Sequence, residues 1–123
     1  MVDEQFHLTE LEDLIEVVIE DGTDVTEESL LTFKDRLLAV ERWQSKPLLV
    51  HMGAIKGVSL EARGRISRYR HPMPVAVVGK SSMDRVIAAY VLRSPTNSHY
   101  FTTLDAALLW LHAELLQSED KIA

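Results

Sequence analysis

The sequence predicts a single α/β domain in which strands alternate with helices around one mixed β-sheet. Short, uninterrupted apolar runs recur along the chain, as expected of central strands buried on both faces. Between these runs lie segments whose apolar residues repeat at helical spacing. The chain has 123 residues, which suits one hydrophobic core and is too short for a second. We therefore assign residues 1–123 to one domain.

The first two elements are predicted to be strands that form a hairpin. Apolar and polar residues alternate around Phe6 and Leu8, and again from Ile15 to Glu20. This alternation is typical of strands with one buried face. Glu12-Asp13 interrupts the pattern between them, and Asp21-Gly22 ends the second strand.

A helix and a buried strand follow. Thr26 precedes two acidic residues, which is the pattern of a helix N-cap with acids in the first turn, and the apolar spacing extends the helix to about Arg42 or Trp43. The apolar run from Leu48 to Met52 predicts a central strand, and Gly53 to Val58 predicts a loop.

The remaining elements repeat this alternation. Ser59 is predicted to cap a helix that extends to Tyr69, and Val75 to Val78 is the next buried strand. A capping pattern at Ser81 begins a third helix. A last strand at Tyr100-Phe101 precedes a final helix that is capped by Thr103 and expected to fray after Gln117. The predicted order is ββαβαβαβα, with parallel crossovers after the hairpin.

Composition restricts where the protein acts. The absence of cysteine excludes disulfides and thiolate metal sites. The first residues lack the basic and apolar regions of a secretion signal, and no run approaches the roughly 18 apolar residues of a membrane span. We expect a soluble, cytoplasmic protein without a membrane span.

Charge is distributed unevenly along the chain. Residues 1–33 contain eleven acidic residues and neither lysine nor arginine, whereas residues 34–93 carry a net charge of +8. The two segments can form separate solvated surfaces, which is the simpler interpretation. They also allow self-association, for example as a homodimer, or anion binding by the basic part.

Three stretches resemble those of small STAS-like bacterial proteins. They are Ser59-Leu-Glu-Ala-Arg63, Val75 to Ser82 leading into Arg85-Val-Ile-Ala88, and Tyr100-Phe-Thr102 followed by Ala106 to Leu111. This group has the fold of the anti-sigma-factor antagonists, called SpoIIAA-like, and includes lipid-binding SEC14-like relatives. The resemblance implies one mixed sheet and a regulatory or protein-interaction module.

The resemblance also implies a role for Ser59. Phospho-regulated members of the group carry an Asp-Ser-Ser-Gly-type motif, whose serine a partner kinase phosphorylates. The matching place here reads Gly57-Val-Ser-Leu-Glu61, which retains only the serine. Ser59 is therefore either a phosphorylation site, with Lys56 and Arg63 close in sequence, or simply the N-cap of its helix.

No pattern of catalytic or metal-binding residues is complete. Gly57-x-Ser59-x-Glu61 lacks the second glycine of a nucleophile elbow. Pro74 stands where a Walker A loop ending at Ser81 needs its first glycine. The five histidines show no paired ligand spacing. We predict that the protein is not an enzyme and has no cofactor or metal.

Arginines at positions 63, 65, 68 and 70 form a basic stretch, but only Tyr69 is available for base stacking. Nucleic acid is therefore not an expected partner.

Two functions remain. The first is binding of a partner protein at the loop Gly53 to Val58 and the start of the Ser59 helix. The second is binding of a small apolar or anionic ligand, which an enclosed pocket of several hundred Å³ would favour. The residues expected to contact a partner or anion are Lys56, Arg63, Lys80, Ser81, Ser82 and Arg85.

Overall fold

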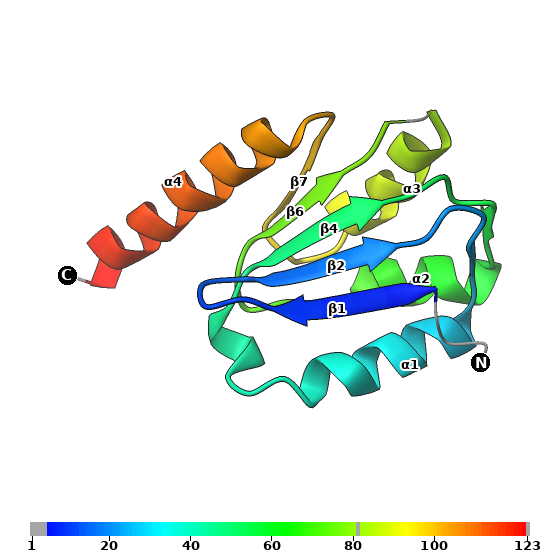
Figure 1. Cartoon of the computed structure of the whole chain (residues 1–123), viewed down its shortest axis with the longest axis horizontal. Helices are drawn as coiled ribbons and strands as arrows, with labels where there is room; N and C mark the ends of the chain where they lie inside the picture. Colours follow the sequence, from blue (N-terminus) through cyan, green and yellow to red (C-terminus); the bar gives the residue numbers. More distant parts are fainter. Residues whose placement is uncertain (1–4, 81, 123) are drawn as a thin grey trace.

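A computed structural model describes residues 5–80 and 82–122, without the side chains of residues 82, 83 and 117–122. It confirms one mixed sheet of five strands in the order β1-β2-β4-β6-β7 (Figure 1). β1 runs antiparallel to β2, and the other neighbouring strands are parallel. The strands are β1 (Phe6–Glu10), β2 (Ile15–Ile19), β4 (Leu48–Met52), β6 (Val75–Val78) and β7 (Ser98–Phe101).

Helices cover both faces of the sheet. One face packs against α1 (Glu27–Leu38), α2 (Leu60–Arg68) and α3 (Ser82–Leu92), and the opposite face packs against α4 (Leu104–Ile122) (Figure 1). The predicted order is confirmed for the five strands of this sheet and the four helices. None of the described helices is long and apolar enough to cross a membrane.

Side-chain caps fix where two of these helices begin. The Thr26 hydroxyl accepts a hydrogen bond from the Ser29 backbone N–H at 3.1 Å, and the Ser29 hydroxyl pairs with the Thr26 N–H at 2.9 Å. The Ser59 hydroxyl accepts from the Ala62 N–H at 3.1 Å. Each contact satisfies a backbone donor that the first turn of a helix leaves without an intrahelical partner.

The first helix is shorter than its apolar spacing predicts. It ends at Leu38, and a short 3-10 helix, Trp43–Ser45, follows. Between them Arg42 has a φ of 63°, in the left-handed region that interrupts helical geometry. Val40 and Trp43 still pack against the core, which explains why the spacing suggested a longer helix.

The predicted loop after β4 contains a small strand. β5 (Gly57–Val58) pairs in parallel with β3 (Asp24–Val25), so this loop is held against the end of β2. Gly53 lies in close contact there, since its N–H donates to the Ile19 carbonyl at 2.8 Å. An added Cβ at Gly53 would lie 2.5 Å from that carbonyl oxygen.

The core has two unequal layers. The larger lies between the sheet and the first three helices, and the smaller lies under α4. Alternation along β2 shows the division: Val17 is 1% exposed in the larger layer, whereas Val18 is 36% exposed on the other face. The sheet face that packs against α4 also carries His51, whose Nε2 lies 2.9 Å from the Glu16 Oε2.

Candidate ligand pocket

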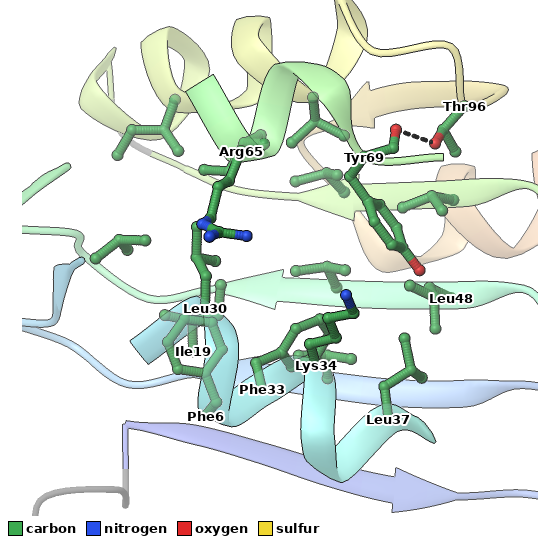
Figure 2. A pocket seen from close by; sticks show the side chains of 18 of the residues that line it. Phe6, Ile19, Leu30, Phe33, Lys34, Leu37, Leu48, Arg65, Tyr69 and Thr96 are labelled. Carbon is green, nitrogen blue, oxygen red and sulfur yellow. Dashed lines mark hydrogen bonds between the residues drawn. The ribbon is translucent and has the colours of Figure 1, made fainter. Parts of the chain in front are cut away.

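The larger core layer contains a pocket that is partly open to solvent. A pocket of about 530 Å³ lies between α1, α2 and the facing side of the sheet (Figure 2). This volume falls within the range of small-molecule sites in proteins. The wall from α1 includes Leu30, Phe33 and Leu37, the wall from α2 includes Ile66, and the floor includes Val17, Val50, Met52, Val75 and Val77.

The pocket reaches the protein surface between the two helices. Leu31 and Leu38, which line it from α1, are 41% and 47% exposed, whereas Leu37 on the same helix is 1% exposed. Leu37 therefore lies on the side of α1 that faces the pocket interior, and Leu31 and Leu38 lie on the side at its mouth. A ligand can therefore enter between α1 and α2 without crossing the sheet.

The charged residues of the pocket all have one sign. Lys34 and three arginines of the second helix and its exit, Arg65, Arg68 and Arg70, line it, and no acidic side chain in the described part of the chain does so. The chain as a whole carries a net charge of -6. The pocket is thus an apolar chamber with a basic mouth in an acidic protein, which favours an apolar ligand over a cationic one.

An ion pair connects the two helices beside this mouth. The Arg65 Nε lies 2.7 Å from the Glu27 Oε2, and the two side chains are 40% and 46% exposed. Figure 2 shows the Arg65 side chain extending from α2 toward α1, and the Lys34 side chain extending from α1 toward α2. Since exposed ion pairs of this kind contribute only about 0.2–1 kcal/mol, this contact holds the helices together weakly.

A polar group lies within the apolar wall. The Tyr69 hydroxyl lies 2.7 Å from the Nδ1 of His71, and the Nε2 of His71 lies 2.9 Å from the Lys46 carbonyl oxygen. Because a carbonyl oxygen only accepts, Nε2 carries the hydrogen and Nδ1 accepts from the Tyr69 hydroxyl. The Tyr69 oxygen keeps lone pairs that can accept a hydrogen bond from a ligand.

Burial determines the protonation of this tyrosine–histidine pair. It raises the pKa of Tyr69 to about 12. It also lowers the pKa of His71, against the smaller opposing effect of the hydrogen bond to the Lys46 backbone. Both side chains are therefore neutral near pH 7. Thr96 completes the network, because its hydroxyl donates to the Tyr69 carbonyl at 2.9 Å and accepts from the His71 N–H at 2.8 Å.

The residues predicted to bind a partner or anion lie elsewhere. Lys56 and Lys80 are exposed near the carboxyl ends of β4 and β6. The Arg63 guanidinium lies 5.6 Å from the Tyr90 ring centroid, and its Nε donates to the Val58 carbonyl at 3.2 Å. Arg85 lies 5.8 Å from the Tyr100 ring centroid. None of these residues lines the pocket.

The serines of the predicted anion site are only partly placed. Ser59 caps α2, and its hydroxyl is occupied by that cap. Ser81 lies outside the described residues, as does the side chain of Ser82. Within the part of the chain that the structure describes, no hydrogen bond or ion pair joins the Ser59 segment to Lys80 or Arg85. The predicted contacts stay predictions.

The sequence pattern indicated the basic residues of α2 but not their position at a pocket. The sequence pattern suggested Arg65, Arg68 and Arg70 only as part of a nucleic-acid surface, and it did not single out Lys34. The available signal was the position of Lys34, Arg65 and Arg68 beside the apolar faces of their helices. No histidine cluster appears either, since the described residues contain no group of three side chains placed to hold a metal.

A solved structure with the same architecture supports the fold assignment. It is an uncharacterised protein from the DUF3478 family of Shewanella loihica PV-4, described as having a SpoIIAA-like fold. The match has a TM-score of 0.57 and 16% sequence identity, and covers 86% of this chain and 91% of that one. The chain has a SpoIIAA-like fold. The identity is too low to transfer function, so the SpoIIAA-like likeness establishes architecture only.

The SpoIIAA-like fold confirms the resemblance inferred from the sequence. Comparisons with models of protein families and with curated protein sequences gave no match. The pocket is therefore the feature of this chain that bears on its function.

Proposed function

We propose that this SpoIIAA-like protein binds a small apolar ligand in the pocket between α1 and α2. The observation that carries the proposal is the pocket itself: about 530 Å³ bounded mainly by aliphatic and aromatic side chains, where the core of a small domain is ordinarily filled. The function is binding without catalysis, in the cytoplasm, and needs no cofactor.

Burial of apolar surface supplies the driving force. Each CH₂ group removed from water contributes roughly 0.8 kcal/mol, so a ligand of a dozen carbons gains enough to offset its loss of motional freedom. The floor is rigid because β2, β4 and β6 are hydrogen-bonded neighbours. The α1 wall is joined to α2 only weakly at Glu27 and Arg65, so it can adjust to the ligand.

The test is binding of an uncharged fluorescent probe, N-phenyl-1-naphthylamine, to the whole protein and two matched variants. Val50→Phe adds a ring to the pocket floor, and Val18→Phe adds the same ring on the opposite sheet face. We expect saturable binding that Val50→Phe weakens at least ten-fold and Val18→Phe leaves unchanged. Absent binding, or equal binding by both variants, would exclude the pocket as the site.

A second candidate function is recognition of a partner protein at the start of α2. Leu60, in the first turn, is 76% exposed, and it lies next to Ser59 on the surface predicted from the sequence. A partner that buried this leucine would gain roughly 1.5–3 kcal/mol from the apolar surface removed from water. Phosphorylation of Ser59 would add charge at a helix N-terminus and so regulate that contact.

Affinity purification from the native host tests this candidate. Proteins retained by the unaltered chain and lost with Leu60→Asp, but kept with Leu109→Asp on the exposed side of α4, would support it. Phosphoserine at position 59 in the purified protein would support regulation. Identical sets of bound proteins with both variants would count against the Leu60 surface. Self-association, predicted from the charge distribution, stays a prediction that sedimentation at two salt concentrations tests.

A further inference from the structure

We infer that the ligand of this pocket is an amphiphile: an apolar chain that ends in one anionic group, which Lys34 and Arg65 receive at the mouth. The inference deepens the proposed function and depends on it, because it names the chemistry of the ligand that the same pocket takes.

The first support is the sign of the charges around the mouth. Among the described residues, every charged residue that lines the pocket is basic, although acidic residues outnumber basic ones in the chain, 19 to 13. All four residues come from the basic segment 34–93, so the mouth gathers part of the charge of that segment. A basic mouth on an apolar chamber matches a ligand that is apolar along its length and negative at one end.

The second support is the state of Lys34. This residue is exposed, and within the described residues it forms no ion pair. Lys34 lines the pocket, and Figure 2 shows its side chain extending from α1 toward α2. A lysine can lay its aliphatic stem along an apolar chain and place its ammonium group beside an anionic end, which suits both parts of an amphiphile.

The third support is the position of Glu27. It lies seven residues before Lys34, which is two turns along the same side of α1, and its carboxylate already contacts Arg65 at 2.7 Å. Glu27 thus shows that the Arg65 guanidinium can hold a carboxylate beside the mouth. Since this pair is exposed and weak, an anionic ligand can take the place of Glu27 at little cost.

The experiment compares ligands that share a twelve-carbon chain. Dodecanoic acid, dodecyl phosphate and dodecanol compete with N-phenyl-1-naphthylamine for the whole protein at low salt. We expect both anions to bind more tightly than dodecanol by about five-fold or more, and this advantage to shrink at high salt. The preferred anion identifies the headgroup as carboxylate or phosphate. Inorganic phosphate at the same concentration should not displace the probe, because it lacks the chain.

Three variants assign the anion to its residues. Lys34→Gln should weaken binding of the anions about five-fold and leave dodecanol unchanged, whereas Lys34→Arg should retain anion binding. Glu27→Gln releases Arg65 from its internal partner, so it should strengthen anion binding two- to five-fold. Lys56→Gln, an exposed lysine outside the pocket, is the control and should change nothing.

The possible failures are distinguishable. If dodecanol binds as tightly as the anions and none of the variants separates them, the pocket is apolar only, and the inference of an anionic group is overturned while the proposed function stands. If neither the probe nor any twelve-carbon ligand binds, the proposed function fails and this inference fails with it. Displacement by inorganic phosphate alone would also overturn the amphiphile.

Discussion

The Tyr69 hydroxyl donates its hydrogen to Nδ1 of His71 across 2.7 Å, at the boundary between the apolar pocket and the segment that follows α2. His71 is 3% exposed, and its other ring nitrogen is held by the Lys46 carbonyl. This contact fixes the Tyr69 ring as a wall of the pocket. It therefore connects the stability of the domain with the shape of the proposed site.

Tyr69→Phe tests this connection. The change keeps the ring but leaves Nδ1 of His71 buried without its donor, so we expect the free energy of unfolding to fall by about 1–3 kcal/mol. Urea denaturation monitored by circular dichroism measures it. Tyr90→Phe, a tyrosine on α3 outside the pocket, is the control. An unchanged midpoint for Tyr69→Phe would contradict the assigned hydrogen bond.

The lowered pKa of His71 predicts a pH dependence of stability. The unfolded chain binds a proton at His71 below about pH 6.5, whereas the folded chain resists protonation there because the ring is buried. The contribution of His71 is thus complete above about pH 6.5 and is lost as the pH falls below it. His71→Gln should flatten the slope of stability between pH 7.5 and pH 5, and exposed His112→Gln should not.

Gly53 is predicted to be intolerant of a side chain. A Cβ there would lie 2.5 Å from the Ile19 carbonyl oxygen and 2.8 Å from the Asp21 backbone nitrogen, and backbone atoms cannot move aside cheaply. We expect Gly53→Ala to lower the free energy of unfolding by about 1–3 kcal/mol.

Gly57→Ala is the matched control in the same loop. Its added Cβ would meet only the Asp24 carboxylate oxygen, at 3.4 Å, which is an ordinary contact. Thermal unfolding of the two variants compares them directly. Equal destabilisation would show that the clash at Gly53 does not hold the loop against β2.

Ser59 is predicted to contribute to stability as a cap, whether or not it is modified. Ser59→Ala removes the acceptor of the Ala62 N–H and should cost about 1 kcal/mol, whereas Ser59→Asp retains an acceptor and should cost less. Denaturant midpoints measure both. If alanine and aspartate are equivalent, the hydroxyl is not the cap that stabilises α2.

The strands and helices were predictable because their signals are local. The alternation on β2, the apolar run of β4 and the caps at Thr26 and Ser59 each depend on a few neighbouring residues. The end of α1 was not predictable from the sequence. The apolar residues after Leu38 keep helical spacing, although Arg42 adopts a left-handed conformation there. The short pairing of β3 with β5 joins segments more than thirty residues apart, which no local pattern reports.

The pocket was less predictable than the fold. Leu30, Phe33 and Ile66 have the spacing of ordinary core residues, and the sequence does not indicate whether the faces they form meet or stay apart. The distance between α1 and α2 depends on the packing of the whole layer. Candidate anion contacts were placed at the carboxyl ends of the strands by a general rule for open α/β sheets, whereas the pocket lies under the helices.

A two-dimensional ¹H–¹⁵N NMR titration of the whole protein with dodecanoic acid tests the central claim most directly. The proposed function predicts saturable shifts at the amides of α1, α2 and the facing strands, including Leu30, Ile66 and Val50. Small or absent shifts are expected at the amides of α4, which lies on the opposite face of the sheet. Unchanged spectra, or shifts confined to residues 53–58 and the start of α3, would contradict the pocket as the ligand site.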